Sequence, residues 1–278
     1  RHSLVIDGEC MERVGRFLDR LYRHMTEGMY PATSTNLTTV DNFNTVVAHA
    51  GPVPTAGDLI AQVPCAGMLG TMLSVQYRMH HQIMNSSSSQ FYQNELKAHP
   101  SVVDHTLDEI AGIETSEFSG RIMSFIDTAG AGWDEELEPN GLSKRNPNEA
   151  NLVVKKVQTL LNAGLPKNDI AVIAPYAAQV RLLRDLFAGE GPEVDTVDGF
   201  QGREKEAVVI SLVRSNPQNE IGFLADRRRM NVALTRARRK LIVIGDSSTL
   251  GIDEFYREFF EYVESISGYL TVWTENED

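Results

Sequence analysis

The stretch "DIAVIAPYAAQVRLLRDLFAG", residues 169–189, decides the fold of this sequence. Its opening apolar run is rich in β-branched residues and favours a buried strand. Pro175 ends that strand, because proline cannot donate a hydrogen bond to the ladder. From Tyr176 onward the apolar side chains recur at helical spacing as far as Gly189. A buried strand followed directly by a helix is the repeating unit of parallel sheets.

The same alternation of strand and helix extends through most of the chain. We expect further strands at 121–130, 193–197, 206–213 and 240–246, and further helices at 81–96, 146–164 and 252–266, with a basic helix starting near 227. Strands of this kind, alternating with helices, predict an α/β fold with a parallel sheet and helices on both faces. Ligands then belong at the carboxyl ends of the strands. The acidic segment 134–146 is expected to be a loop.

The helix expected at 146–164 carries its own start and stop signals. Asn146 suits the N-cap, Pro147 the first helical position, and Glu149 the acidic position of a capping box. Gly164 suits the residue that ends the helix.

Composition excludes several classes of protein. The 278 residues carry a net charge of −12, with 42% apolar and 23% charged residues, as in a globular protein of one or two domains. No apolar run approaches the roughly 18–20 residues of a membrane helix. The start shows no signal-peptide pattern and lacks Met, which predicts a fragment or a processed chain. Cys10 and Cys65 fit no metal pattern, which predicts a reducing compartment and no structural zinc.

The acidic chain contains one strongly basic stretch, "RRRMNVALTRARRK", residues 227–240. On a helix, Arg229, Val232, Arg236 and Arg239 share one face. Guanidinium groups placed together need an anion or acids to neutralise them, and their planar fork suits phosphate oxygens. A solvated face with internal salt bridges is the alternative. The small residues within the stretch favour close approach of another surface.

Three further clusters lie at predicted element boundaries. In "TVDGFQGREKEAVVIS" (196–211), Gly199 and Gly202 allow a turn between two strands. Gln201, Arg203 and Glu204 then bring hydrogen-bonding groups to the sheet edge. A glycine-containing turn with exposed charges is the alternative.

In "APYAAQ" (174–179), Tyr176 and Gln179 begin a helix and could contact a base or a phosphate, or simply cap the strand. In "QYRMH" (76–80), Arg78 points away from its neighbours if Tyr77 and Met79 enter the core. The adjacent His80 and His81 have no metal-ligand spacing, so no metal site is predicted.

The four clusters in this order resemble the second RecA-like domain of superfamily 1 helicases. The resemblance covers residues 71–266 and is closest to the branch of the nonsense-mediated-decay and immunoglobulin mu-binding helicases. It implies a RecA-like fold of the P-loop NTPase type. It also implies ATP-driven movement along RNA or DNA, 5′ to 3′, with ATP and Mg²⁺ as cofactors.

The resemblance also implies residue roles. It assigns a catalytic role to Arg78 and Arg236, as arginine fingers on the γ-phosphate, and to Gln201 beside the phosphates. The nucleotide-binding residues it implies are Gly202, Glu204, Tyr77 and Arg229, with Glu204 near the ribose. The nucleic-acid-binding residues it implies are Pro175, Tyr176, Gln179 and Thr196. Its implied partners are single-stranded RNA or DNA and a first RecA-like domain.

The sequence departs from that family in two respects, the phosphate loop and the Asp-Glu pair that should hold Mg²⁺, since no adjacent Asp-Glu follows an apolar strand in residues 1–70. It contains no G-x-x-x-x-G-K-[ST] phosphate loop, and "VIDGEC" (5–10) and "GDLIAQVP" (57–64) are only faint echoes of first-domain motifs. The identity of residues 1–70 is left open: the segment is a remnant of the first domain, a divergent form of it, or unrelated to it. Residues 71–278 are expected to be the C-terminal RecA-like domain, which alone hydrolyses little ATP.

Two rival functions remain open from the sequence. One is a non-catalytic helicase-like module that binds nucleic acid or protein. The other is a different nucleotide-binding α/β enzyme, for which the required glycine-rich phosphate loop is missing. The intact arginines and Glu204 favour the helicase, in the cytoplasm or nucleus and away from membranes.

Overall fold

The computed structural model describes residues 74–139 and 141–274. Residues from Ser74 onward form one compact unit. The predicted segment 1–70 and its two motif echoes lie outside the described residues, so their assignment stays a prediction.

A six-stranded sheet forms the centre of this unit, in the order β10-β3-β9-β8-β6-β7. Every neighbouring pair in it is parallel. Its strands are β3 (Met123–Asp127), β6 (Ile170–Ala174), β7 (Glu193–Thr196), β8 (Lys205–Ser211), β9 (Ala237–Gly245) and β10 (Tyr269–Thr271). This confirms the predicted parallel sheet, which apolar β-branched runs build because both of its faces are buried.

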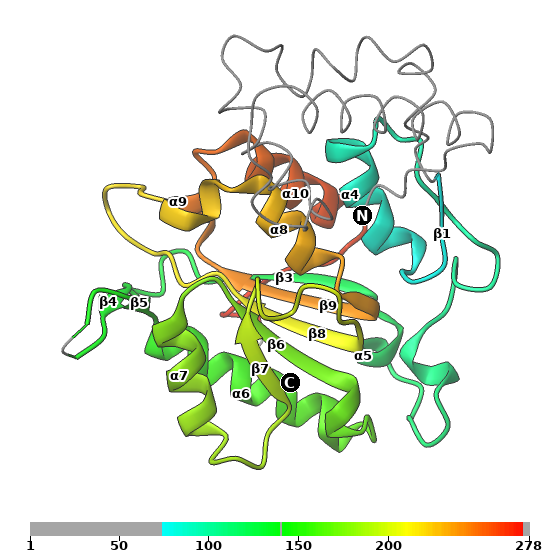
Figure 1. Ribbon diagram of the computed structural model, residues 1–278, viewed down its shortest axis with the longest axis horizontal. Helices are drawn as coiled ribbons and strands as arrows, with labels where there is room; N and C mark the ends of the chain where they lie inside the picture. Colours follow the sequence, from blue (N-terminus) through cyan, green and yellow to red (C-terminus); the bar gives the residue numbers. More distant parts are fainter. Residues whose placement is uncertain (1–73, 140, 275–278) are drawn as a thin grey trace, which may run out of the picture. The chain divides into compact units, whose positions relative to one another are not determined.

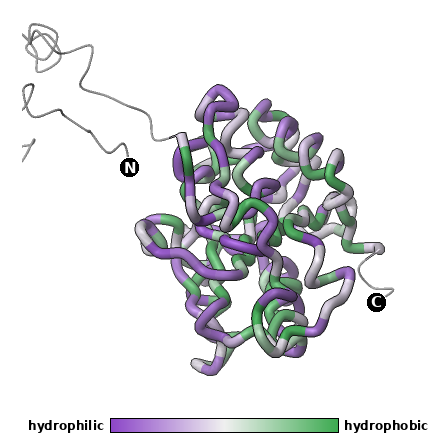
Figure 2. Tube along the Cα trace, turned by 90° about the vertical axis from the view of Figure 1, so that its right-hand side faces the viewer, coloured by the Kyte–Doolittle hydropathy of each residue, from purple (hydrophilic) through white to green (hydrophobic). Residues whose placement is uncertain are grey.

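Helices cover both faces of the sheet (Figure 1). One face packs against α4 (His81–Phe91), α8 (Arg227–Leu234) and α10 (Glu254–Ser265), and the other against α6 (Pro147–Asn162) and α7 (Ala177–Leu186). Successive side chains of β8 enter opposite cores, Val208 the first and Val209 the second. Green apolar and purple polar segments accordingly alternate along the trace in Figure 2. This architecture is the RecA-like α/β fold that the sequence predicts.

The shorter elements lie around this frame. They are two strand pairs, β1 (Val75–Gln76) with β2 (Lys97–Ala98) and β4 (Glu136–Leu137) with β5 (Lys144–Arg145), the helices α5 (Glu117–Gly120) and α9 (Ser247–Leu250), and the 3-10 turns η2 (Leu107–Glu109), η3 (Lys167–Asp169) and η4 (Gly222–Ala225). The predicted acidic loop therefore contains a small hairpin. In the described part of the chain, no helix is long and apolar enough to cross a membrane.

The predicted signals of α6 are confirmed except at Glu149. The Asn146 side chain accepts a hydrogen bond from the Glu149 backbone N at 3.1 Å, Pro147 opens the helix, and Gly164 has φ +98°. The Glu149 side chain does not close a capping box. The backbone N of Asn146 donates instead to Gln179 Oε1 at 2.9 Å, which leaves Glu149 free to enter the core.

The predicted basic helix is shorter than expected. It ends at Leu234. Arg236 Nε donates to the Val232 carbonyl at 2.8 Å, which its own backbone N would use in a continuing helix, and that backbone N donates to the Ala233 carbonyl at 3.2 Å instead. Arg239 consequently lies on β9 and not on a helical face shared with Arg229.

Candidate active site

Arg78 lies in a tight turn that the side chain of Gln76 stabilises. Gln76 Oε1 accepts hydrogen bonds from the backbone N of Arg78 at 2.8 Å and of Met79 at 2.7 Å. Met79 enters the core, whereas Tyr77 is 63% exposed and stacks on His99 with ring centroids 4.2 Å apart. Only Met79 of the two side chains is therefore a core residue, and Tyr77 is free to face a ligand.

The Arg78 side chain reaches two segments that are distant in the sequence. Its Nε pairs with the Glu204 carboxylate, and its Nη1 donates to the Thr235 carbonyl at 3.2 Å. About a third of the side chain remains exposed, 34%. Arg78 therefore lies between the segment before β8 and the segment before β9.

Arg236 lies beside Arg78 but is held differently. It is 9% exposed, and besides its bond to Val232 its guanidinium donates to the Arg203 carbonyl at 3.1 Å and to Thr235 Oγ1 at 3.2 Å. Burial, and next the positive charge of Arg78, lower the pKa of Arg236. Glu204 acts in the opposite direction. Two guanidinium groups thus share the neighbourhood of one carboxylate, an arrangement that an added anion would stabilise.

These residues lie at the end of the sheet opposite to the expected one. Glu204 precedes β8 and Arg236 precedes β9, so both are at the amino ends of parallel strands. Arg78, Glu204 and Arg236 are therefore not at the carboxyl ends, where ligands were expected, and their role in nucleotide binding stays a prediction. The physical reason for their position is the crossover: α8 returns the chain across the sheet and delivers Thr235 and Arg236 at the amino edge.

Residues 197–204 connect the carboxyl end of β7 to the amino end of β8. Phe200 anchors this connection in the core, whereas Gln201, Gly202 and Glu204 are exposed. Gly202 has φ +86°, and a Cβ built there meets no atom within 4 Å. Only the backbone angle therefore favours glycine at this position, and the surface beside it is open to a ligand.

Arg229 is exposed on the first turn of α8. Its guanidinium lies 3.4 Å from an Asp198 carboxylate oxygen and 3.6 Å from one of Asp226. Both acids already neutralise it, so nucleotide binding by Arg229 stays a prediction that requires exchange of these partners.

The predicted nucleic-acid-binding residues lie at the carboxyl end of the sheet. Ala174 is the register partner of Thr196, so Pro175 and Thr196 stand side by side where β6 and β7 end, each partly exposed. Tyr176 and Gln179 are buried there, 4% and 0% exposed. Gln179 Nε2 donates to the Asn146 carbonyl and to Ser211 Oγ, at 3.1 and 3.0 Å.

The prediction of nucleic-acid contact is therefore wrong for Gln179, whose side chain is enclosed and fully used in joining α6 to β8. It is also wrong for stacking by Tyr176, because its ring is covered. The Tyr176 hydroxyl accepts hydrogen bonds from Arg214 Nη1 and the Phe223 backbone N, both at 3.3 Å. The alternative that the sequence left open, a cap between strand and helix, describes the position of Tyr176, which is the N-cap residue of α7 without a side-chain capping bond.

Sequence reasoning missed a buried acid in this region. Glu149 Oε2 accepts hydrogen bonds from Ser211 Oγ at 2.6 Å and from the Val213 backbone N at 2.9 Å. Complete burial raises the pKa of Glu149 to about 8, against the partial opposing effect of these two bonds. In the sequence, Glu149 fits the acidic position of a capping box. Nothing in the neighbouring residues therefore indicated that its side chain is buried in the core.

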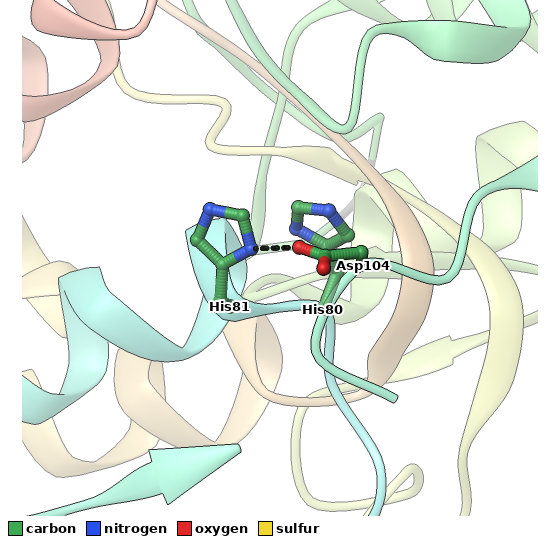
Figure 3. A group of neighbouring side chains, drawn as sticks. All are labelled: His80, His81 and Asp104. Atoms are coloured by element: carbon green, nitrogen blue, oxygen red, sulfur yellow. Dashed lines mark ion pairs between the residues drawn. The ribbon is translucent and has the colours of Figure 1, made fainter. Parts of the chain in front are cut away.

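His80, His81 and Asp104 lie together at the start of α4 (Figure 3). Their possible ligand atoms are within 4.8 Å of one another. His80 Nδ1 already accepts from the Gln82 backbone N at 3.0 Å, and His81 Nδ1 lies 2.8 Å from the Val103 carbonyl and 3.2 Å from Asp104. These bonds account for the group as a helix cap, and the prediction that no metal binds stays a prediction.

The parallel sheet with helices on both faces defines a RecA-like domain. Two neighbouring arginines, Arg78 and Arg236, lie at the amino ends of its strands. Residues 59–248 match the model of a protein family described as "AAA domain", and the chain belongs to this family. It is 48% identical over 193 residues to the DNA-binding protein SMUBP-2 of Rattus norvegicus. It is 42% identical over 200 residues to the DNA polymerase alpha-associated DNA helicase A of Schizosaccharomyces pombe. These matches confirm the helicase resemblance.

The matches cover 69% of this chain in both cases, but only 20% of the first relative and 30% of the second. The chain thus spans less than a third of the length of these relatives. Among solved structures, the C-terminal domain of a possible DNA helicase from a Lactobacillus is similar, with a TM-score of 0.40 and 12% identity, covering 70% of this chain and 98% of that one.

Proposed function

We propose that this chain supplies the second half of the ATP site of an ATP-dependent helicase, together with part of its single-strand-binding surface. The observation that carries the proposal is the convergence of Arg78 and Arg236. The two guanidinium groups come from distant parts of the sequence; Glu204 pairs with Arg78, and its charge also acts on Arg236. Such an excess of positive charge fits a triphosphate, and the four sequence clusters support the same function.

Each residue of this half-site has a physical task. The Arg78 fork, partly exposed, exchanges Glu204 for γ-phosphate oxygens and stabilises the charge that develops during phosphoryl transfer. Arg236 is pre-positioned by its carbonyl partners and adds a second positive charge. Once Arg78 binds the phosphate, the Glu204 carboxylate is available to accept a hydrogen bond from the ribose. Gly202 and Gln201 line the surface that the nucleotide approaches.

The half-site fits the triphosphate but not Mg²⁺. Its one carboxylate, Glu204, pairs with Arg78 and lies 3.9 Å from Arg238 Nε. Mg²⁺ prefers several oxygen ligands, including water, so we assign it to the first RecA-like domain. The partner domain also supplies the phosphate loop, which this sequence lacks.

The nucleic-acid surface is assigned to the opposite edge, around Pro175 and Thr196. Backbone and side-chain groups at strand ends are suited to tracking a sugar-phosphate chain. The names of the relatives, which include DNA helicases, support a nucleic-acid partner. For such a partner we infer a site of action in the cytoplasm or nucleus.

ATP turnover tests the proposal. We expect the longest natural form of the protein to hydrolyse ATP and this 278-residue chain to be inactive, with and without single-stranded RNA or DNA. Arg236→Ala and Arg78→Ala should each lower turnover of the long form by about 10³-fold or more. Arg227→Ala is the matched control, since Arg227 belongs to the same basic stretch but pairs with Asp253 on the surface.

Two results would contradict the proposal. Turnover by the 278-residue chain alone would place a complete phosphate site within it. Inactivity of both forms would favour a non-catalytic binding module, which the missing phosphate loop also allows.

A further inference from the structure

Phe223 is a large aromatic residue whose side chain is exposed to solvent. It lies in η4, on the connection between β8 and α8, and is 62% exposed. Its ring centroid is 5.4 Å from that of Tyr176, at an interplanar angle of 43°. One side of the phenylalanine thus rests on a buried residue while the rest of the ring is uncovered.

The backbone on both sides of Phe223 is fixed. Gly222 has φ +55°, and a Cβ there would come within 2.6 Å of the Tyr176 hydroxyl and 2.7 Å of Arg214 Nη1. Leu224 is completely buried, and its carbonyl accepts a hydrogen bond from the Tyr256 hydroxyl at 2.9 Å. Because its neighbours are held, Phe223 is presented outward by a rigid support, which keeps the entropic cost of binding low.

The position of Phe223 connects it to the proposed nucleic-acid surface. Tyr176, on which it rests, directly follows Pro175, and Pro175 stands beside Thr196 at the carboxyl ends of β6 and β7. In Figure 1 the yellow connection that carries Phe223 lies beyond the end of the sheet where α9 and the β4–β5 hairpin are found. Hydrogen bonds from Ser215 to Asp246 and from Asn216 to Thr249 hold the connection at this end.

A positive charge stands close to Phe223 in the sequence. Arg228 is exposed, and among residues 74–139 and 141–274 no acid forms an ion pair with it, whereas its neighbours Arg227 and Arg229 each pair with acids. An exposed ring followed by an available guanidinium is the combination that single-strand-binding surfaces use, the ring for bases and the cation for phosphates.

We propose that Phe223 is a stacking platform for a base of the bound single strand, an inference that rests on the proposed function. It replaces Tyr176 in that role, since the Tyr176 ring is covered and forms the support beneath. Stacking of this kind tolerates any base, as a helicase that moves along a strand requires. The inference adds a specific side chain to a surface that is otherwise polar.

The experiment measures binding of fluorescent single-stranded DNA and RNA to the 278-residue chain and to its variants by anisotropy. We expect Phe223→Ala to weaken binding about tenfold and Phe223→Trp to retain it. Leu186→Ala is the matched control, because Leu186 is also apolar and exposed, 42%, but is the last residue of α7, a helix that starts at the carboxyl ends of the strands and runs away from them. Thermal unfolding should be unchanged by Phe223→Ala, since the ring is mostly exposed.

Oligonucleotides with abasic positions separate stacking from other contacts. The wild-type chain should bind an abasic strand about tenfold more weakly than the intact strand, and Phe223→Ala should bind both alike. Normal binding of the intact strand by Phe223→Ala would overturn the stacking inference and favour a protein partner for the ring, while leaving the proposed function intact. Failure of the wild-type chain to bind any strand would overturn both.

Discussion

At the residue scale, burial decides the role of Glu149. Glu149 stands in the first turn of α6, where the sequence suggests a helix cap. Its carboxyl group is instead completely buried against the end of β8. An acid in such a site favours its protonated form, because the charged form loses its hydration. Glu149 is therefore a structural acid, and it is expected to make folding depend on pH.

Replacement of Glu149 by Gln should remove this dependence. The pKa of Glu149 is raised from 4.5 to about 8 in the folded chain, so its stabilising effect is complete below pH 4.5 and is lost as pH rises through 8. Relative to Glu149→Gln, the free energy of unfolding of the wild type should fall by up to about 1.4 kcal/mol per pH unit across that window. Urea titrations from pH 4.5 to 8.5 measure it. Glu220→Gln, at an exposed acid, is the control, and parallel pH profiles of wild type and Glu149→Gln would contradict the assignment.

At the same scale, local pattern singled out the clusters of Arg78, Arg236 and Glu204, but only the family resemblance assigned them to one site. Local pattern could not have joined them, because the contacts of Arg78 with Glu204 and Thr235 span more than a hundred residues. The errors have the opposite origin. Tyr176 and Gln179 carry polar groups that suit a ligand, yet those groups satisfy buried carbonyl, amide and guanidinium partners of the chain itself.

At the element scale, α8 shows how a basic helix starts against its own dipole. Three arginines, 227–229, occupy its first turn, where the helix dipole disfavours positive charge. Asp226 offsets them, since its side chain accepts a hydrogen bond from the Arg229 backbone N at 3.2 Å and lies near the Arg229 guanidinium.

Asp226→Ala should therefore destabilise the domain by about 1 kcal/mol, the usual effect of losing an N-cap. Asp226→Asn keeps the capping oxygen and loses the charge, so it should cost less. Urea unfolding midpoints of the two variants and the wild type separate the two effects. Equal midpoints for wild type and Asp226→Ala would show that α8 is held by packing alone.

Most of the strands that sequence patterns predicted have apolar cores; β7, in which only Val194 is buried, is the exception. β3, β6, β8 and β9 contain continuous buried runs, and each was expected. The β4–β5 hairpin was expected to be a loop because its cross-strand pair is ionic, Glu136 opposite Arg145, with no apolar alternation. β10 was not expected, although Tyr269 and Thr271 are residue types that favour strands; the strand is only three residues long and partly buried. A strand that is stabilised by hydrogen bonds and ion pairs with its neighbour, without buried apolar side chains, cannot be predicted from a hydrophobic pattern.

At the scale of the whole domain, the basic stretch is largely neutralised from within. Arg238 and Arg239 both pair with Glu206, Arg229 pairs with Asp198, and Lys240 is buried, donating to backbone carbonyls. The stretch is thus partly the internally paired face that the sequence left as an alternative. Together with the net charge of −12, this leaves few cations to bind phosphates.

Binding of single strands by this chain should consequently be weak and should fall with added salt. The logarithm of the binding constant decreases by about 0.7 per neutralised phosphate for each unit of the logarithm of salt concentration, so few contacts give a shallow slope. Arg228→Ala should reduce the slope by about one phosphate, because Arg228 has no ion pair among the described residues. Arg238→Ala, which breaks an internal pair with Glu206, should leave it unchanged. Anisotropy titrations between about 25 and 200 mM salt measure both slopes. Tight, salt-independent binding would mean that base stacking, and not phosphate contact, dominates the surface, because only the phosphate contribution depends on counterion release.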